Sequence, residues 1–223
     1  MNLFYAPLHA LEQKFIDYLL RLQTGPQQGI LVLCPSERVA THLQRRLLKH
    51  RSVLGNITFQ TLSQLMSQLD KQAAVWRAPL LPNDHLHDYL LKNLLSRPQL
   101  RRYPVSAGLI SALKASLRDL ADAMVEPEVL KEHWLSLPDF SAADEQAHLK
   151  WLIDVYSAYL AEMQQMPQYR SYATYFAQVL QEAEDSDYLR GFKQILLYGF
   201  YDFTGRQLEF FHTLRRHYPL AVF

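Results

Sequence analysis

Clusters of basic residues are the features of this sequence that could do chemistry, because guanidinium and ammonium groups bind phosphate without reading a base sequence. Three clusters stand near expected helix ends: Arg45 and Arg46 with residues 49–51, Arg97 with residues 101–102, and residues 215–217. The first is the best candidate for phosphate contact, because it lies on the helix that follows a turn at Pro35 and Ser36. Solvated helix ends would also explain all three clusters, so both interpretations stay open.

Other catalytic and metal chemistries find little support in the sequence. His85 and His87 form the only close pair among nine histidines, and an i, i+2 spacing places their rings on different faces of a helix. His212 and His217 have no cysteine or carboxylate cluster at ligand spacing, so we expect no metal and no other cofactor. Cys34 ends an apolar run, which predicts an inert core thiol and not a nucleophile.

Composition narrows the class of protein. Apolar residues make up 49% of the 223 residues and charged residues 20%, which predicts a globular core. The net charge of +1 argues against a strongly basic nucleic-acid-binding surface, although a local patch is compatible with it. A single cysteine suits a reducing cytosol, so we expect a cytoplasmic protein. No run of ~18 apolar residues is present, and therefore no membrane span is expected.

Short apolar runs that alternate with helical patterns predict an α/β fold with a parallel sheet covered by helices. The expected strands cover residues 2–6, 29–34, 57–59, 195–198 and 220–223. The expected helices carry apolar residues at helical spacing: Leu11, Phe15, Tyr18 and Leu22; Val39, Leu43 and Leu47; Leu62, Leu65 and Leu69; and Leu208, Phe211 and Leu214. Because the last expected strand ends with the chain, we expect this sequence to be part of a longer protein.

The middle of the chain has a different pattern, with apolar stripes at helical spacing and prolines between them. The stripes run through Leu86, Leu90 and Leu94; Ile110, Leu113, Leu117, Leu120 and Met124; Leu149, Leu152, Tyr156, Leu160 and Met163; and Tyr172, Phe176 and Val179. We therefore expect residues 1–70 and 191–223 to form one α/β core. Residues 71–190 would be a large all-helical insertion in that core.

Three segments carry a resemblance to a known family. Residues 33–47 begin Leu-Cys-Pro-Ser-Glu-Arg, residues 57–62 read Ile-Thr-Phe-Gln-Thr-Leu, and residues 198–207 read Tyr-Gly-Phe-Tyr-Asp-Phe-Thr-Gly-Arg-Gln. In order and spacing they resemble motifs of the first motor domain of superfamily-one helicases. They are more similar to the helicase-like N-terminal region of AddB-type proteins, which carry a PD-(D/E)XK nuclease domain further on.

The resemblance implies a P-loop NTPase-like core and contacts to the backbone of single-stranded DNA. Such contacts suit hydroxyl groups and helix N-termini. The residues implied are Ser36, Arg38, Arg45, Arg46, Thr58 and Gln60.

The sequence departs from working helicases where nucleotide chemistry requires particular groups. A phosphate-binding loop needs glycines followed by Lys and Ser or Thr, whereas residues 7–14 contain no glycine and no such pair. We expect Lys14 to lie on a helix surface. Tyr198 and Gly199 stand where helicases have the two carboxylates that bind magnesium and orient water. Asp202 and Gln207 match the later Asp and Gln of the same helicase segment. The chain is therefore expected neither to bind nor to hydrolyse ATP productively.

These observations predict an ATPase-inactive, helicase-like module of a DNA recombination or repair nuclease. It would guide single-stranded DNA or support a partner motor, and the resemblance implies an AddA-like helicase-nuclease subunit as that partner. The exonuclease centre of the parent protein would lie outside this chain, which by itself is not expected to be an enzyme. Two alternatives are a protein-interaction scaffold without DNA contact and a residual nucleotide binder.

Overall fold

The computed structural model describes residues 2–3, 7–22, 29–50, 55–72, 84–133, 143–166, 169–170 and 172–223. They form two compact units. The first contains Met1–Val75, Ala177–Phe203 and Gln207–Phe223, and the second contains Trp76–Phe176 and Thr204–Arg206.

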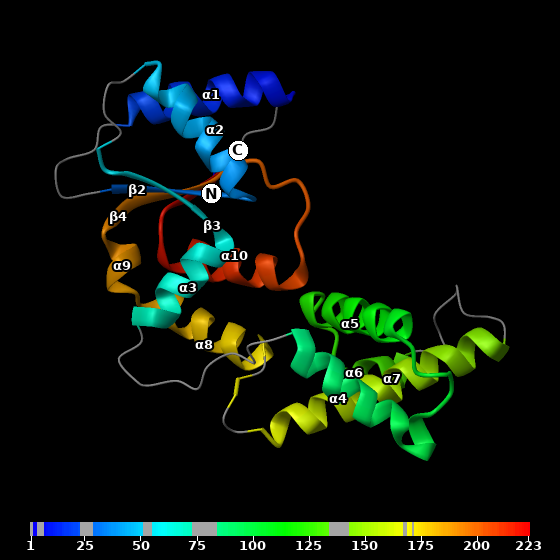
Figure 1. The fold of residues 1–223 in the computed structure, drawn as a ribbon. Helices are drawn as coiled ribbons and strands as arrows, with labels where there is room; N and C mark the ends of the chain where they lie inside the picture. The colour runs from blue at the N-terminus through cyan, green and yellow to red at the C-terminus, as the bar shows by residue number, and fades with distance from the viewer. Residues whose placement is uncertain are drawn as a thin grey trace. The chain divides into compact units, whose positions relative to one another are not determined.

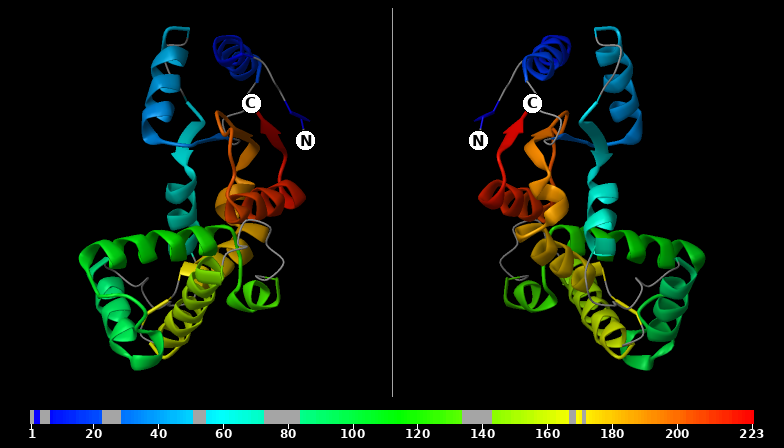
Figure 2. Two further views of the ribbon diagram at one scale, coloured as in Figure 1. Left: turned by 90° about the vertical axis from the view of Figure 1, so that its right-hand side faces the viewer. Right: turned by 90° about the vertical axis from the view of Figure 1, so that its left-hand side faces the viewer.

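The first unit is built on a parallel sheet, as predicted. Its strands are β1 (Asn2–Leu3), β2 (Gly29–Cys34), β3 (Ile57–Thr61), β4 (Phe192–Leu197) and β5 (Leu220–Val222). Their order across the sheet is β1-β5-β4-β2-β3, and every pair of neighbours is parallel. Segments far apart in the sequence therefore lie side by side, and β5 runs beside β4 in both views of Figure 2. Of the expected first strand, residues 4–6 lie outside the described residues.

The two faces of the sheet are covered by different pairs of helices. Figure 1 shows α1 (Leu8–Arg21) and α2 (Glu37–Leu48) on one face, and α3 (Leu62–Gln72) and α10 (Gly205–His217) on the other. This follows from the order of the strands. The crossovers from β1 to β2 and from β2 to β3 run in one direction across the sheet, whereas those leading to β4 and β5 run in the other. Right-handed crossovers of opposite direction place their helices on opposite faces.

Alternation along the strands builds the core under α1 and α2. Ile30, Val32 and Cys34 of β2 point to this face, because successive side chains of a strand point to opposite sides. They pack with Phe15 of α1 and Leu43 of α2, both fully buried. Cys34 is buried, as predicted, and its burial raises the pKa of the thiol to about 12.

The second unit contains most of the remaining helices. They are α4 (Asp84–Ser96), the 3-10 turn η1 (Pro98–Leu100), α5 (Ala107–Asp122), α6 (Pro127–His133), α7 (Ala143–Gln164) and the first turn of α8 (Tyr172–Glu184). Their core joins α4, α5 and α7 through residues such as Leu91, Ile110 and Val155. The indole N–H of Trp151 donates a hydrogen bond to the carbonyl of Leu100, at 2.7 Å from Nε1 to oxygen, which ties α7 to η1.

Two residues of the predicted core-facing stripes are exposed instead of buried. Met124, exposed by 47%, lies in the turn after α5, where its positive φ of 59° takes the chain out of helical register. Tyr172, exposed by 49%, begins α8. Helical spacing alone predicted that these two residues face the core, and the prediction was wrong at both positions.

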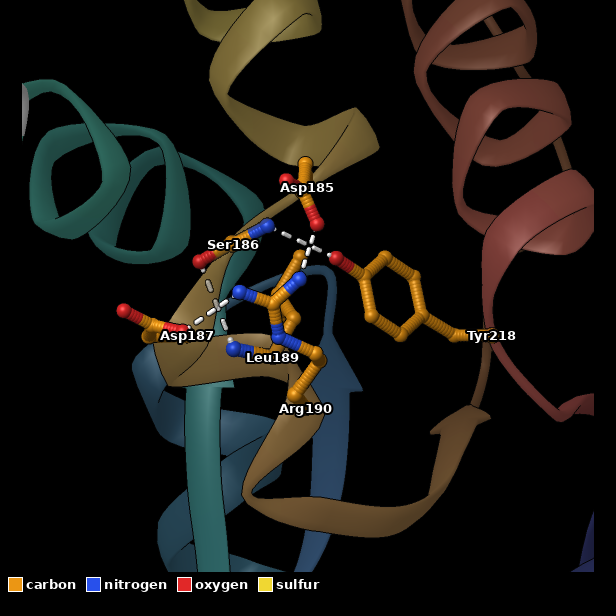
Figure 3. Close-up of polar contacts among 6 residues, drawn as sticks. All are labelled: Asp185, Ser186, Asp187, Leu189, Arg190 and Tyr218. Carbon is orange, nitrogen blue, oxygen red and sulfur yellow. Dashed lines mark hydrogen bonds and ion pairs between the residues drawn. The ribbon is translucent and has the colours of Figure 1, made fainter.

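The helical unit ends earlier than the expected boundary at residue 190. Residues 177–190, with the short helix α9 (Asp187–Arg190), belong to the sheet unit because polar contacts fasten them to the end of α10. Figure 3 shows the buried N–H of Ser186 donating to the hydroxyl of Tyr218, at 3.0 Å. The hydroxyl of Ser186 caps α9 by accepting from the N–H of Leu189, at 3.3 Å, and the guanidinium of Arg190 joins Asp185 and Asp187.

Candidate functional site

The three family-like segments come together at one edge of the sheet. The segments of residues 33–47 and 198–207 begin at the carboxyl ends of β2 and β4, whereas residues 57–62 cover β3 and the first residue of α3. Because β4, β2 and β3 are neighbours and parallel, the turns that follow them lie side by side. The chain leaves β2 towards β3 and leaves β4 towards β5, in opposite directions. The crevice between such strands is a topological switch point, which is where open α/β sheets bind their ligands.

The turns after β2 and β4 are in direct contact. The N–H of Tyr198 donates to the carbonyl of Leu33, at 3.0 Å, and extends the pairing of these strands by one bond. Gly199 follows with φ of +75°, a backbone conformation that residues with a side chain rarely adopt. A methyl group at Gly199 would lie 3.9 Å from the ring of Pro35. The turns after β2 and β4 are therefore packed closely together at the carboxyl edge of the sheet.

Ser36 is the N-cap of α2. Its hydroxyl accepts a hydrogen bond from the N–H of Val39, at 3.4 Å. The Ser36 side chain therefore caps the helix, in addition to any contact with a ligand. The neighbouring Glu37 accepts from the side-chain amide of Gln64, at 2.8 Å, which joins the start of α2 to α3.

A capping box at the start of α3 was not anticipated. The N–H of Thr61 donates to Oε1 of Gln64, at 2.8 Å, and the N–H of Gln64 donates back to Oγ1 of Thr61, at 3.2 Å. The sequence carries the signal for it, since Thr61 and Gln64 have the Thr-x-x-Gln spacing. Because Gln64 also binds Glu37, this box holds the turns after β2 and β3 together.

Thr58 and Gln60 lie on β3 itself and not in the turn that follows it. Both are half-buried and line an open hollow of about 400 Å³ along the outer strand, with Phe59, Gln64, Ser67, Gln68 and Lys71. Gln60 is also a hydrogen-bond partner of the Tyr188 hydroxyl, an interaction that partly offsets the burial that raises the pKa of Tyr188. These two predicted residues therefore line a different hollow from the one that the basic groups of α2 line.

The exposed face of α2 carries the basic residues best placed for an anionic ligand. Arg38, Thr41, His42 and Arg45 line an open hollow of about 380 Å³ together with Glu37. Arg38 and Arg45 are exposed and have no hydrogen-bond or ion-pair partner among the residues that the structure describes. Their guanidinium groups lie two turns apart on one face of a helix that starts at the switch point.

Arg46 has a different environment from Arg45. Its Nε lies 2.8 Å from Oε1 of Glu12 on α1, and Nε2 of His42 lies 2.9 Å from Oε2 of the same carboxylate. Burial of Glu12 opposes its ionisation, but the contacts with His42 and Arg46 outweigh that effect and hold its pKa below the ordinary value. Of the two adjacent arginines proposed from the sequence, only Arg45 is available to a ligand without breaking an ion pair.

Aromatic rings fill the region beside the switch point on the α1 face. Tyr198 is 4% exposed, and its ring centroid lies 4.6 Å from that of Phe15 and next to the Phe15–Phe223 pair, whose centroids are 5.1 Å apart. Burial raises the pKa of Tyr198 to about 12, and the nearby Glu12 and Cys34 add to this. Lys14 and Asp202 are exposed, and Gln207 is half-buried on α10.

Comparisons with known proteins add no assignment: no protein-family model matches the chain, and no curated protein sequence matches it. Among the described side chains, no three His, Cys, Asp or Glu residues gather as metal ligands would. No helix in the described ranges has both the length and the apolar character needed to cross a bilayer.

Proposed function

We propose that this chain is an ATPase-inactive, helicase-like module of a DNA recombination or repair nuclease, which guides single-stranded DNA past a partner motor subunit. The observation that carries the proposal is that the three helicase-like segments belong to the neighbouring strands β4, β2 and β3 and to the turns at the carboxyl ends of these strands. Ligands of open α/β sheets bind at such an edge, and a P-loop NTPase-like core would use it for nucleotide and nucleic acid.

The exposed face of α2 supports a contact with the DNA backbone. Arg38 and Arg45 present two unpaired guanidinium groups over a shallow hollow, which can follow a phosphate chain but cannot enclose a base. The hollow beside Thr58 and Gln60 is also open and polar and offers hydroxyl and amide donors. A surface of this kind would bind single-stranded DNA without sequence preference.

The proposed loss of ATPase activity has support from the residues near the switch point. The Tyr198 ring packs against Phe15 at the position where the resemblance would require a magnesium-binding carboxylate. The exposed Lys14 lies in the middle of α1, with no glycine-rich loop before it. ATP hydrolysis that is stimulated by DNA and lost in a Lys14→Ala variant would refute this part of the proposal.

A salt series tests the DNA contact. Binding of a fluorescent oligothymidine is measured between about 50 and 200 mM salt, and each phosphate contact contributes about 0.7 to the slope of log affinity against log salt. The Arg38→Ala/Arg45→Ala variant should lower that slope by about 1.4. Arg118→Ala/Lys131→Ala is the matched control, because it removes two exposed cations of α5 and α6 that lie outside the three basic clusters, and it should leave the slope unchanged.

A protein-interaction scaffold is the second candidate, and the ion pair of Arg46 with Glu12 favours it, because it removes one cation from the surface that DNA would meet. A scaffold would show no salt-dependent oligothymidine binding by the wild-type chain. The same titration therefore separates the two candidates.

A further inference from the structure

β3 lies at the edge of the sheet, because β2 is the one strand of the described residues that pairs with it. In Figure 2, β3 (cyan) is at one margin of the sheet. The two strands pair from Ile30 with Ile57 to Cys34 with Thr61, without a shift in register. Such an edge offers its unpaired main-chain N–H and carbonyl groups to a strand of another chain.

The main-chain groups of Ile57 and Phe59 point away from β2. The carbonyl of Asn56 accepts from the N–H of Ile30 on β2, at 2.7 Å. Because successive residues of a strand turn their main-chain groups to alternate sides, Ile57 and Phe59 turn theirs to the outer side. Neither residue has an outer partner among the residues that the structure describes. Each therefore offers one donor and one acceptor to a partner.

Within the part of the chain that the structure describes, β3 has none of the features that protect edge strands from pairing. Its sequence, Ile-Thr-Phe-Gln-Thr, contains no charged residue and no proline, and its pairing with β2 contains no bulge. β-Branched and aromatic residues also favour the extended conformation. At Thr61 the edge is closed, since the N–H of Thr61 donates to Oε1 of Gln64, at 2.8 Å. The open part of the edge is therefore formed by residues 57–60.

The hollow of about 400 Å³ beside Thr58 and Gln60 runs along this open edge. The side chains of these two residues alternate with those of Ile57 and Phe59, which pack against the core under α1 and α2. The opposite wall is one side of α3, with residues spaced as i, i+3, i+4 and i+7: Gln64, Ser67, Gln68 and Lys71. This lining is polar and includes one charged residue, so it suits the polar side chains of an added strand.

We propose that β3 binds an extended segment of a partner protein, which joins the sheet as a further strand. The main chain of that segment would exchange hydrogen bonds with Ile57 and Phe59. Its side chains would alternate, with polar ones in the hollow beside Thr58 and Gln60, and apolar ones beside Ile57 and Phe59 on the other face. Main-chain pairing would supply the affinity, and the hollow would supply the selectivity.

The chemistry of the edge favours a polypeptide over other occupants. Phosphates offer only acceptors, so nucleic acid backbone cannot satisfy the outward carbonyls of Ile57 and Phe59. A second copy of the chain, paired edge to edge, would bring its own α2 onto the same face of the joined sheet. The unpaired Arg38 and Arg45 of the two copies would then repel each other. The edge includes neither arginine, so the proposal does not depend on the DNA contact.

Selection from a displayed library of random peptides provides the probe. The full chain is the bait, and the Ser67→Arg variant, whose long side chain fills the hollow, is the counter-selection bait. Enriched peptides should alternate apolar and polar residues. A synthetic copy of the most enriched peptide is then methylated at one main-chain nitrogen at a time. Methylation at every second residue should lower the affinity about tenfold, whereas methylation at the residues between should change it less than about twofold, because only one edge of the peptide is paired.

Amide hydrogen exchange locates the bound peptide on the chain. Binding should slow exchange at Ile57 and Phe59, whose N–H groups face outward, and should leave the amides of Thr58 and Gln60 unchanged because these already pair with β2.

Two controls accompany the Ser67→Arg variant. Ser111→Arg adds the same side chain at an exposed serine of α5 and should leave peptide binding unchanged. Ser67→Arg itself should bind the peptide about tenfold more weakly than the wild type and melt near the wild-type temperature, because arginine is a good helix former and the hollow is open.

Four results would overturn the proposal. They are no enrichment over the counter-selection bait, no alternation in the effects of methylation, and no slowing of exchange at Ile57 and Phe59. The fourth is a loss of oligothymidine affinity or of self-association in Ser67→Arg, which would assign the edge to nucleic acid or to a second copy of the chain. A failure of the Arg38 and Arg45 experiment would leave these outcomes unaffected.

Discussion

The guanidinium of Arg46 and the carboxylate of Glu12 join α2 to α1, with 2.8 Å between Nε and Oε1. The adjacent Arg45 is exposed and faces the open hollow on α2. We therefore predict that Arg46→Ala lowers the free energy of unfolding by about 1 kcal/mol, the value expected for a partly exposed ion pair. Arg45→Ala should change it by less than about 0.5 kcal/mol and should weaken oligothymidine binding instead. Urea unfolding and a binding titration on both variants measure the difference.

Arg46→Lys is the informative companion variant. It keeps the charge but loses the planar geometry of the guanidinium, so part of the stability should be recovered and DNA affinity should stay near that of the wild type. The assignment of separate roles fails if Arg45→Ala and Arg46→Ala lower DNA affinity equally.

The pH dependence of stability should also report on Glu12. The contacts with His42 and Arg46 outweigh the effect of burial and hold the pKa of Glu12 in the folded state below its ordinary value. A carboxylate with a lowered folded pKa stabilises the fold fully above the unfolded pKa, and this contribution is lost as the pH falls through the folded pKa. The difference in unfolding free energy between the wild type and Glu12→Gln should therefore be constant above about pH 5 and shrink below about pH 4.

Denaturant unfolding at a series of pH values measures this difference. His42→Gln leaves the bond with Arg46 in place, so it should show a smaller version of the same dependence. A difference that grows on acidification would contradict the assigned direction of the Glu12 shift.

Tyr198 should not tolerate replacement by aspartate, the residue that the proposed helicase resemblance would require at this position. The Tyr198→Asp variant would place a charge among Phe15, Phe223 and Cys34, where no described cation is a partner of Tyr198. We predict a loss of at least about 3 kcal/mol of stability, as for other unpaired buried charges, and no gain of phosphate release from ATP. Thermal melting and a phosphate-release assay measure the two outcomes.

Tyr198→Phe separates the ring from its hydroxyl group. The hydroxyl has no hydrogen bond within the described part of the chain, so this variant should stay within about 1 kcal/mol of the wild type. Appreciable ATP hydrolysis by Tyr198→Asp would contradict the prediction, because it would show that the carboxylate at this position is all that nucleotide chemistry lacks.

Local patterns predicted the strands and most helices, because buried strands such as Gly29–Cys34 and stripes such as Val39, Leu43 and Leu47 reveal themselves over a few residues. The order of the strands depends on pairing between segments far apart in the sequence, and the alternation of strand and helix patterns along the chain does not reveal it. The partner of Arg46 is equally hidden, since Glu12 lies 34 residues away in sequence.

The errors have identifiable physical causes. The helical pattern of α8 continues through Phe176 and Val179 without a break, so it could not reveal that the two residues belong to different units. Met124 continues the helical spacing of Leu117 and Leu120, but its positive φ lies just beyond the end of α5 and turns it away from the core. The capping box at Thr61 and Gln64, by contrast, was readable from its spacing alone.

The hydroxyl of Tyr218 satisfies the buried N–H of Ser186, and its loss should be costly. Tyr218→Phe keeps the ring and removes the acceptor, which leaves a buried donor without a partner, so stability should fall by about 1 to 3 kcal/mol. The amide hydrogen of Ser186 should also exchange faster with solvent, because its bond is the link between the start of α9 and the residue after α10. Tyr201→Phe is the matched control and should change neither quantity, since that hydroxyl is in solvent. Unchanged stability together with unchanged exchange at Ser186 would show that this bond does not hold residues 177–190 on the sheet unit.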